Sequence, residues 1–181
     1  MRHNPFRALV IAGVIAIAPA ALAETGHRFL IAQTEVQPRA QGDVLEVAAA
    51  TGQFTRFLAA VEAAGYAEEL RGEGPYTIFA PTDEAFRQMD QRELERLMQP
   101  QQRDELVRML SYHVVEGRLT SESVNTVTRA RSLSGYRLDL DGRDGLRVND
   151  RLVAMPDIEA ANGVIQGVNT VLSPPVMVAS R

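Results

Sequence analysis

The residues best placed to do chemistry lie in the stretch YTIFAPTDEAFRQM, which spans residues 76–89. Asp83 and Glu84 are its two carboxylates, and paired carboxylates can act as a general acid and base. Adjacent side chains on a helix point about 100° apart, so these two groups would not converge on one substrate. A strand that ends at Pro81 and a helix capped by Thr82 explain the same residues, with both acids at the positive end of the helix. The spacing therefore predicts a structural strand-to-helix junction.

The remaining titratable residues form no known catalytic set. The chain has 3 histidines and no cysteine, which excludes thiol catalysis, thiolate metal sites and disulfides. It also lacks the sequence motifs of serine hydrolases, P-loop enzymes, zinc proteases and dinucleotide-binding enzymes. His113 follows Tyr112 in an expected strand at 112–115, where their side chains would face opposite ways. A hydrolase would need His113 as its base, so the sequence favours a protein without enzyme activity, cofactor or metal.

The acidic segment DLDGRDG, residues 139–145, invites a calcium-binding interpretation. The calcium-loop template needs an oxygen ligand at its fifth position and glycine at its sixth. Counted from Asp139, these positions hold Arg143 and Asp144, so a cation stands where a ligand belongs. The alternating residues on both sides predict a β-hairpin with an Asp-Gly turn instead.

The composition limits the kinds of partner that the protein can bind. A chain of 181 residues, 45% hydrophobic and 23% charged, is typical of one globular domain with a sizeable core. All 19 basic residues are arginine, and the net charge is −4. An acidic protein without a basic run is a poor nucleic-acid binder, so no nucleic-acid partner is expected.

The N-terminus resembles a secretory signal peptide. Arg2 and Arg7 precede an apolar run at 8–23 that ends in Ala-Leu-Ala, which matches the charged, apolar and cleavage regions of such signals. The run is shorter than the roughly 20 residues of a membrane span, the competing interpretation. The sequence thus predicts a signal peptide over 1–23, cleaved after Ala23, and a periplasmic or secreted mature chain without a membrane span. Residues 24–42 lack periodicity and predict a flexible linker.

The elements around the junction change from helical to β along the chain. Asp43 and Glu46 form a potential capping box for a helix through Ala50, and the apolar spacing from Phe54 predicts a second helix that Gly65 ends. A strand at 76–80 and helices at 91–98 and 101–110 follow. Turn signals then separate a series of expected strands, at 112–115, 128–133, 136–140, 146–148, 151–155 and 163–172. The pattern predicts an α+β domain.

Two motif regions resemble the fasciclin-like domain family. YTIFAPTDEAFRQM is close to the family's T-[VI]-F-A-P-T-[DN]-x-A-F, and NGVIQGVNTVLSPP is similar to its N-G-V-[IV]-H-x-[IV]-D-x-V-L-x-P, with GEGPYT and LSYHVVEGRL in the family's order. Gln166 stands where histidine is usual, and Asn169 where aspartate is common. The matched motif residues, which we expect to be mainly structural, are Thr77, Phe79, Ala80, Pro81, Thr82, Asp83, Phe86, Asn162, Gly163 and Val164.

The resemblance implies a fold and a general role. The implied fold is a wedge of two β-sheets with helices packed alongside, over residues 43–175, followed by a tail at 176–181. The implied role is an exported adhesion or interaction module without enzyme activity. In some animal members a Tyr-His pair and a Pro-Asp-Ile segment are associated with integrin recognition. The matching candidates for partner contact are Tyr112, His113, Asp157 and Ile158, whose alternative role is packing.

The expected partner follows from the signal peptide and the arginine-only composition, which are typical of a bacterial protein. We therefore expect a cell-surface or matrix protein, or a polysaccharide, and not an integrin. The alternative function is a carrier of an apolar small molecule such as a carotenoid or lipid, because some fasciclin-like proteins are similar to carotenoid binders. The side chains considered for this role, most of which helical spacing places in the core, are Phe54, Tyr76, Phe86, Met89, Met109 and Met155.

Overall fold

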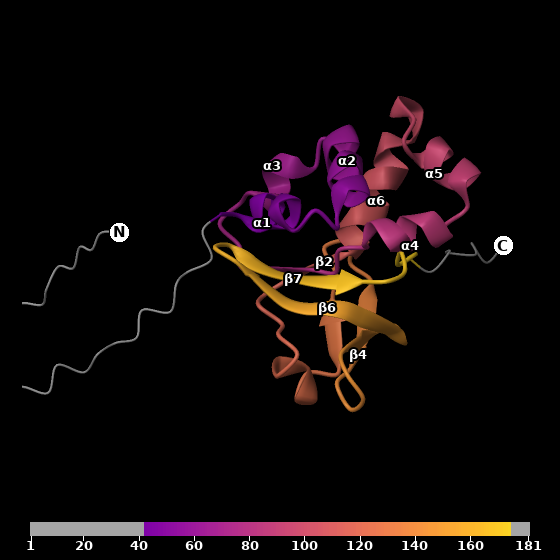
Figure 1. The fold of residues 1–181 in the computed structure, drawn as a ribbon. Coiled ribbons are helices and arrows are strands. Elements are labelled where there is room, and N and C mark those ends of the chain that lie inside the picture. The colour runs from indigo at the N-terminus through magenta and orange to yellow at the C-terminus, as the bar shows by residue number, and fades with distance from the viewer. Residues whose placement is uncertain (1–41, 175–181) are drawn as a thin grey trace, which may run out of the picture. The chain divides into compact units, whose positions relative to one another are not determined.

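The structure is a computed structural model that describes residues 42–174 (Figure 1). The predicted signal peptide, nearly all of the predicted linker and the C-terminal tail lie outside the described residues. Helices dominate the first half and strands the second, so the predicted α+β class is confirmed. The helices are α1 (Val44–Thr51), α2 (Thr55–Ala64), α3 (Ala67–Leu70), α4 (Asp83–Gln88), α5 (Gln91–Leu97) and α6 (Arg103–Tyr112), with 3-10 turns at Pro100–Gln102 and Ser123–Asn125.

The strands form one hydrogen-bonded series. They are β1 (Tyr76–Ile78), β2 (Val114–Glu116), β3 (Arg129–Arg131), β4 (Arg137–Asp141), β5 (Arg147–Val148), β6 (Arg151–Ala160) and β7 (Gly163–Val168). Their order is β2-β1-β7-β6-β5-β4-β3, in which β1 and β7 are parallel and the other pairs are antiparallel. Within residues 42–174, no helix is both long and apolar enough to cross a bilayer.

The two expected β-sheets are joined through β6 into one hydrogen-bonded series. The register of β6 against β7 shifts twice, between Val153 and Met155 and between Met155 and Ile158. Such irregularities let one long strand bend and serve both halves of a sheet. The two ends of the series also meet, because the Leu133 N–H donates to the Val114 carbonyl at 2.8 Å. The sheet therefore curves back on itself.

The caps predicted from the sequence are present. The Asp43 side chain accepts hydrogen bonds from the N–H groups of Leu45 and Glu46, and the Glu46 side chain accepts one from the Asp43 N–H, which completes the capping box of α1. Thr82 caps α4, where the Ala85 N–H donates to the threonine hydroxyl at 3.3 Å. The strand-to-helix junction is thus confirmed.

The strand expected at 112–115 is wrong at its start. Helix α6 continues through Tyr112, His113 is its C-terminal cap, and β2 begins at Val114. Leu106, Met109 and Leu110 are buried along α6, and the helical spacing of the buried side chains extends to Tyr112, so packing overrides the β propensity of the tyrosine. The two aromatic side chains therefore do not alternate across a strand.

The core consists of two apolar clusters on opposite faces of β1. Ile78 belongs to the cluster beneath the helices, and Phe79 to the cluster enclosed by the curved sheet, as the alternation of side chains along an extended chain requires. Figure 1 shows the helices on one side of β7 and β6, and β4 on the other.

The parallel pairing of β1 with β7 requires a close approach at one residue. Tyr76 is opposite Gly163, Thr77 opposite Val164 and Ile78 opposite Ile165. A Cβ atom at Gly163 would lie 2.2 Å from the Tyr76 carbonyl oxygen. The φ of Gly163 is not in the left-handed region, so this glycine is needed for space and not for its conformation.

We predict that Gly163→Ala lowers the free energy of unfolding by roughly 3 kcal/mol, the upper end of the usual range for overpacking, because backbone atoms cannot rotate away as a side chain can. Urea denaturation followed by circular dichroism measures the change. The control is Ala161→Ser, an exposed neighbour expected to stay within about 0.5 kcal/mol of the wild type. Equal stability of Gly163→Ala and wild type would contradict the close approach.

Candidate functional site

His113 is buried, with 1% of its surface exposed. Its Nε2 accepts a hydrogen bond from the Leu172 N–H at 3.0 Å, so Nδ1 carries the proton and donates to the Met109 carbonyl at 2.8 Å. Burial lowers the pKa of the ring to about 4, and the bond to Met109 opposes the shift only in part. With both nitrogens occupied, the imidazole joins α6 to the chain after β7 and has no free position for a substrate.

Tyr112 is also buried and faces the cluster enclosed by the sheet. Its hydroxyl accepts a hydrogen bond from the Asn149 side-chain amide at 2.8 Å, and its ring contacts Tyr136 edge to face at 6.1 Å between centroids. Burial raises the pKa of the Tyr112 hydroxyl, against the effect of the Asn149 bond. This predicted contact residue is therefore part of the interior.

Asp157 lies in the irregular part of β6 with a φ of 57°. Its carboxylate accepts hydrogen bonds from the Ser121 N–H at 2.8 Å, from the Ser121 hydroxyl and from the Gln166 amide at 2.9 Å. Burial of this carboxylate opposes ionisation, but the bonds from Ser121 and Gln166 outweigh it and hold the pKa of Asp157 below its ordinary value. A carboxylate with a lowered pKa is a weak base, and among residues 42–174 no imidazole is hydrogen-bonded to Ser121.

Gln166 fixes this turn from the neighbouring strand. Its side-chain oxygen accepts from the Asp157 N–H at 3.0 Å, and its amide nitrogen donates to the Leu119 carbonyl at 2.9 Å as well as to the Asp157 carboxylate. The side chain is fully buried. The departure from the family pattern at this position therefore supplies three hydrogen bonds that organise the Asp157 turn.

The predicted contact residues do not form one surface. Ile158 is half-buried against the cluster beneath the helices and pairs with Ile165, whereas the Asp157 side chain turns toward Ser121. Among the described residues, no hydrogen bond links Asp157 or Ile158 to Tyr112 or His113.

The motif residue Asp83 has a role that the sequence did not reveal. Its carboxylate accepts hydrogen bonds from the Thr55 hydroxyl at 2.7 Å and the Arg56 N–H at 2.8 Å, and so caps the start of α2 across 27 positions of sequence. Burial opposes ionisation here too, but the bonds from Arg56 and Thr55 keep the pKa of Asp83 below its ordinary value. Sequence reasoning had placed Asp83 only at the start of its own helix, because local patterns do not identify a tertiary partner.

Asn162, in the second motif, connects three segments. Its side-chain oxygen accepts from the Val44 N–H at 2.9 Å, and its side-chain nitrogen donates to the carbonyls of Leu70 at 2.9 Å and Gly72 at 3.0 Å. Thr77 acts similarly in β1, since its hydroxyl donates to the Gly117 carbonyl at 2.6 Å and accepts from a loop N–H. The other matched motif residues lie in the interior, namely Phe79, Ala80, Pro81, Thr82, Phe86, Gly163 and Val164.

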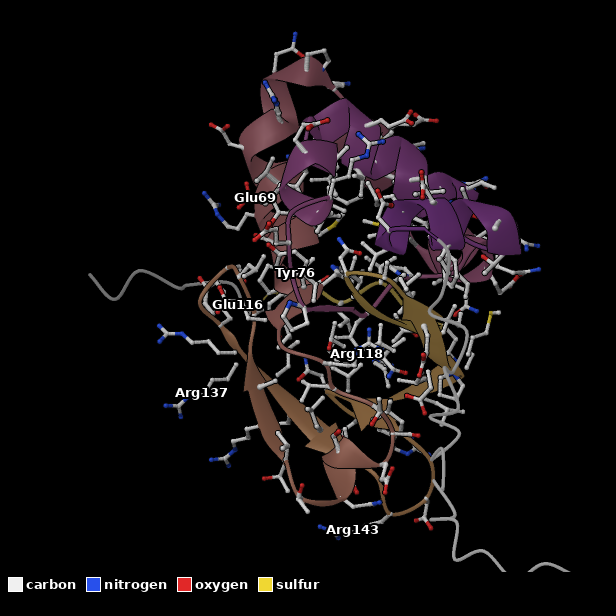
Figure 2. All side chains as sticks on the ribbon, turned by 90° about the vertical axis from the view of Figure 1, so that its left-hand side faces the viewer. Glu69, Tyr76, Glu116, Arg118, Arg137 and Arg143 are labelled. Atoms are coloured by element: carbon white, nitrogen blue, oxygen red, sulfur yellow. The ribbon has the colours of Figure 1, made fainter. Side chains whose placement is uncertain are left out.

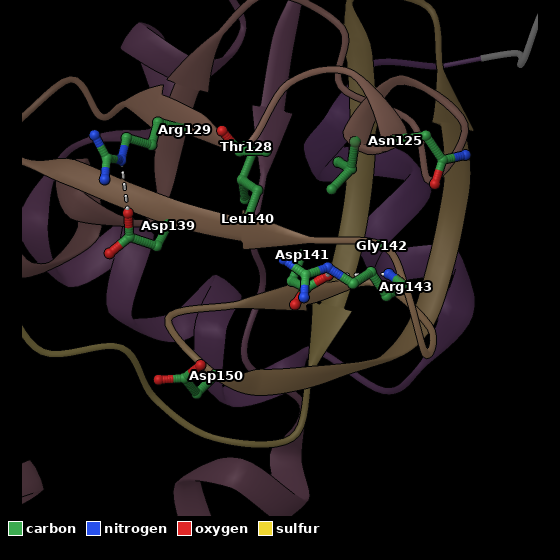
Figure 3. Close-up of a pocket in the computed structure, with 10 residues that line it drawn as sticks. Asn125, Thr128, Arg129, Asp139, Leu140, Asp141, Gly142, Arg143 and Asp150 are labelled. Atoms are coloured by element: carbon green, nitrogen blue, oxygen red, sulfur yellow. Dashed lines mark hydrogen bonds and ion pairs between the residues drawn. The ribbon is translucent and has the colours of Figure 1, made fainter.

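A polar hollow of about 320 Å³ opens beside the turn between β4 and β5 (Figure 3). Two ion pairs line it, Arg129 with Asp139 at 3.2 Å and Arg143 with Asp141 at 3.6 Å. Strands β4 and β5 pair antiparallel here, so the hairpin expected from DLDGRDG is confirmed. Within the described part of the chain, no group of three or more histidine or carboxylate side chains is placed to hold a metal ion.

These features define an α+β module whose buried polar side chains bind one another and the backbone. A model of the fasciclin domain matches residues 52–174, and the chain belongs to the fasciclin domain family. It is 41% identical to Protein sll1483 of Synechocystis sp. over 134 residues, 74% of each chain. It is 39% identical to transforming growth factor-beta-induced protein ig-h3 of Sus scrofa over 135 residues, which are 74% of this chain but 20% of that protein.

A solved structure has the same fold. It is a FAS1 domain pair from the insect cell adhesion molecule fasciclin I, with a TM-score of 0.64 and 14% sequence identity, and the match covers 75% of this chain and 52% of that chain. At this sequence identity, the likeness shows a shared fold.

We predict that His113 makes folding sensitive to acid. Its folded pKa of about 4 lies below its ordinary value of 6.5, so the unfolded chain binds a proton first as the pH falls. Stability from this group is fully present above pH 6.5, falls between pH 6.5 and 4, and is lost below that range, by roughly 3 kcal/mol in all. Urea denaturation at several pH values measures it.

The control for this pH dependence is His113→Gln. This variant is less stable at pH 7.5, and between pH 6.5 and 4 its stability declines less steeply than that of the wild type. Because the carboxylates are common to both proteins, the difference between the two profiles isolates the imidazole. Parallel profiles would contradict a buried neutral His113.

We predict that Gln166→Leu destabilises the protein by roughly 1–3 kcal/mol for each partly buried partner that it leaves unbonded, namely the Asp157 N–H and the Leu119 carbonyl. Thermal and urea unfolding measure the loss. Gln88→Leu is the matched control, because Gln88 is exposed and its replacement is expected to change stability by less than about 0.5 kcal/mol. Similar results for both variants would exclude a special role for Gln166.

Proposed function

We propose that the protein is an exported, non-catalytic adhesion or interaction module that binds a cell-surface or extracellular protein or polysaccharide. One observation carries the proposal. Every buried side-chain nitrogen and oxygen atom among the described residues has a hydrogen-bond partner, including those of His113 and Gln166, the groups that chemistry would need. Function therefore depends on the surface.

The family supports the role in adhesion. The solved structure with the same fold comes from a cell adhesion molecule, and a human relative that is 33% identical over 128 residues is periostin. This chain covers only 15% of periostin and 20% of the porcine ig-h3 protein, so their partners as whole proteins do not transfer to it. The N-terminal pattern of charged, apolar and small residues supports export to the periplasm or the medium.

A polar partner suits this surface better than an apolar ligand. Phe54 and Phe86 have no exposed surface and Met109 has 6%, so these candidate carrier residues belong to the core. The hollow beside the β4–β5 turn is lined largely by charged and polar side chains. Within residues 42–174, Leu152 is the one large apolar residue that is exposed, with 40% of its surface accessible to solvent.

The test is photo-crosslinking in cells that produce the protein. A photoreactive amino acid is placed at Leu152 on the sheet side, or at Glu95 on the helical side, both of which are exposed. Only a probe within a few ångströms of a bound partner can react, so we expect one face to give an adduct that excess unlabelled protein abolishes. The absence of a saturable adduct at both positions, together with no retention of envelope polysaccharide, would contradict the proposal.

A further inference from the structure

Two arginines face each other on the β3–β4 hairpin without a carboxylate partner. Arg131 and Arg137 are direct cross-strand neighbours, and both are exposed. Like charges directly opposite each other destabilise a hairpin. The next pair along, Arg129 and Asp139, forms an ion pair at 3.2 Å. Among the described residues, no salt bridge neutralises Arg131 or Arg137.

The single bond that Arg131 makes leaves most of its donors available. Its Nε donates to the Gly135 carbonyl at 3.3 Å, whereas a guanidinium has five N–H donors. Figure 2 shows Arg137 projecting outward from the strands, below Glu116. This cross-strand pair therefore keeps two positive charges at the surface of a chain whose net charge is −4.

Two hollows flank the turn that joins these arginines, and Gly135 lines both. One, of about 520 Å³, also contains Arg108 and Tyr136, and the other, of about 330 Å³, contains Arg131. Each has one carboxylate, Asp104 or Glu116, yet neither carboxylate forms a salt bridge with these arginines in the described structure. We call the exposed parts of Arg108, Arg131, Tyr136 and Arg137 the arginine surface.

We infer that the arginine surface binds an anionic polysaccharide through its carboxylate or sulfate groups. A planar guanidinium binds such groups with two parallel hydrogen bonds. The hollows have the size of ordinary small-ligand sites and suit sugar rings, and the half-buried Tyr136 ring offers a flat apolar face. An anionic ligand would also relieve the repulsion between Arg131 and Arg137. This inference rests on the proposed function and names its partner.

The backbone around the turn argues against an acidic peptide as the occupant. A peptide that binds by strand addition needs a free sheet edge. Here the Leu133 N–H donates to the Val114 carbonyl at 2.8 Å, the Ser134 N–H donates to the Ser111 carbonyl at 3.2 Å, and Ser132 bridges to Val115. Since the sheet edge beside Arg131 is occupied, a ligand can bind here only through side chains. A sugar chain binds in this way.

The protein is purified from its host in the form that the host produces. Its binding to immobilised alginate, dextran sulfate, neutral dextran and poly-L-glutamate is then measured. We expect the wild-type protein to bind alginate or dextran sulfate, with an affinity that falls as the salt concentration rises. We expect no binding to neutral dextran. Whichever polymer binds shows whether carboxylate or sulfate is recognised. Arg131→Gln with Arg137→Gln should weaken binding at least tenfold, with no lower melting temperature because a repulsion is removed.

The matched control is Arg129→Gln with Arg143→Gln, which removes two exposed arginines already paired with aspartates. It should change binding less than twofold. No binding to either anionic polysaccharide, an equal loss in the control, or equal binding to poly-L-glutamate would overturn the inference. A saturable crosslinked partner in cells, without polysaccharide binding, would overturn this inference alone and leave the proposed function standing.

Discussion

The parallel pairing of β1 with β7 is the contact on which the rest of the fold depends. It joins the first motif region to the second, and the paired residues Tyr76 and Gly163 are 87 positions apart in sequence. Parallel strands cannot be joined by a tight turn, so everything between them must fold around this pair. The intervening chain supplies α4 to α6 above it and the curved sheet below. Asn162 then fixes α1 and α3 to the same point through three hydrogen bonds.

The polar residues of the motifs are used to hold this arrangement. Asp83 caps a distant helix, Thr77 binds the loop after β2, and His113 joins α6 to the chain after β7. The loss of one partner is most costly at His113, because the Leu172 N–H would be left buried and unbonded. Side chains committed in this way cannot also bind a ligand. In the proposed function, recognition depends on exposed side chains outside the motifs, such as Arg131 and Arg137, which have no salt bridge among the described residues.

Local structure was readable from the sequence because its causes are local. The capping box at Asp43, the cap at Thr82 and the Asp-Gly hairpin each depend on residues a few positions apart. The α+β class and the family followed from their order. The end of α6 was misread because Tyr112 has a high strand propensity, and only the tertiary structure shows that it ends the helix with its side chain buried in the cluster enclosed by the sheet.

Tertiary partners could not be read in the same way. The bonds of Asp83 to α2 and of Asn162 to α1 and α3 join residues from 27 to 118 positions apart. The closure of the sheet at Leu133 and Val114 leaves no signal in either segment alone. The arginine surface was missed for the same reason, because Arg131 and Arg137 become a pair only when β3 and β4 are placed in register.

Gln166 stands where the family pattern has histidine, and the two side chains differ in the hydrogen bonds that they can make. A neutral imidazole offers one donor and one acceptor, and a protonated one offers two donors and no acceptor. Gln166 offers an acceptor for the Asp157 N–H together with two donors, and all are used. The Asp157 turn in this chain is therefore held by a group that does not titrate. Among the residues described, His113 is instead a titratable group whose burial makes folding sensitive to acid, and it lies between β1 and β7 in sequence and inside the core.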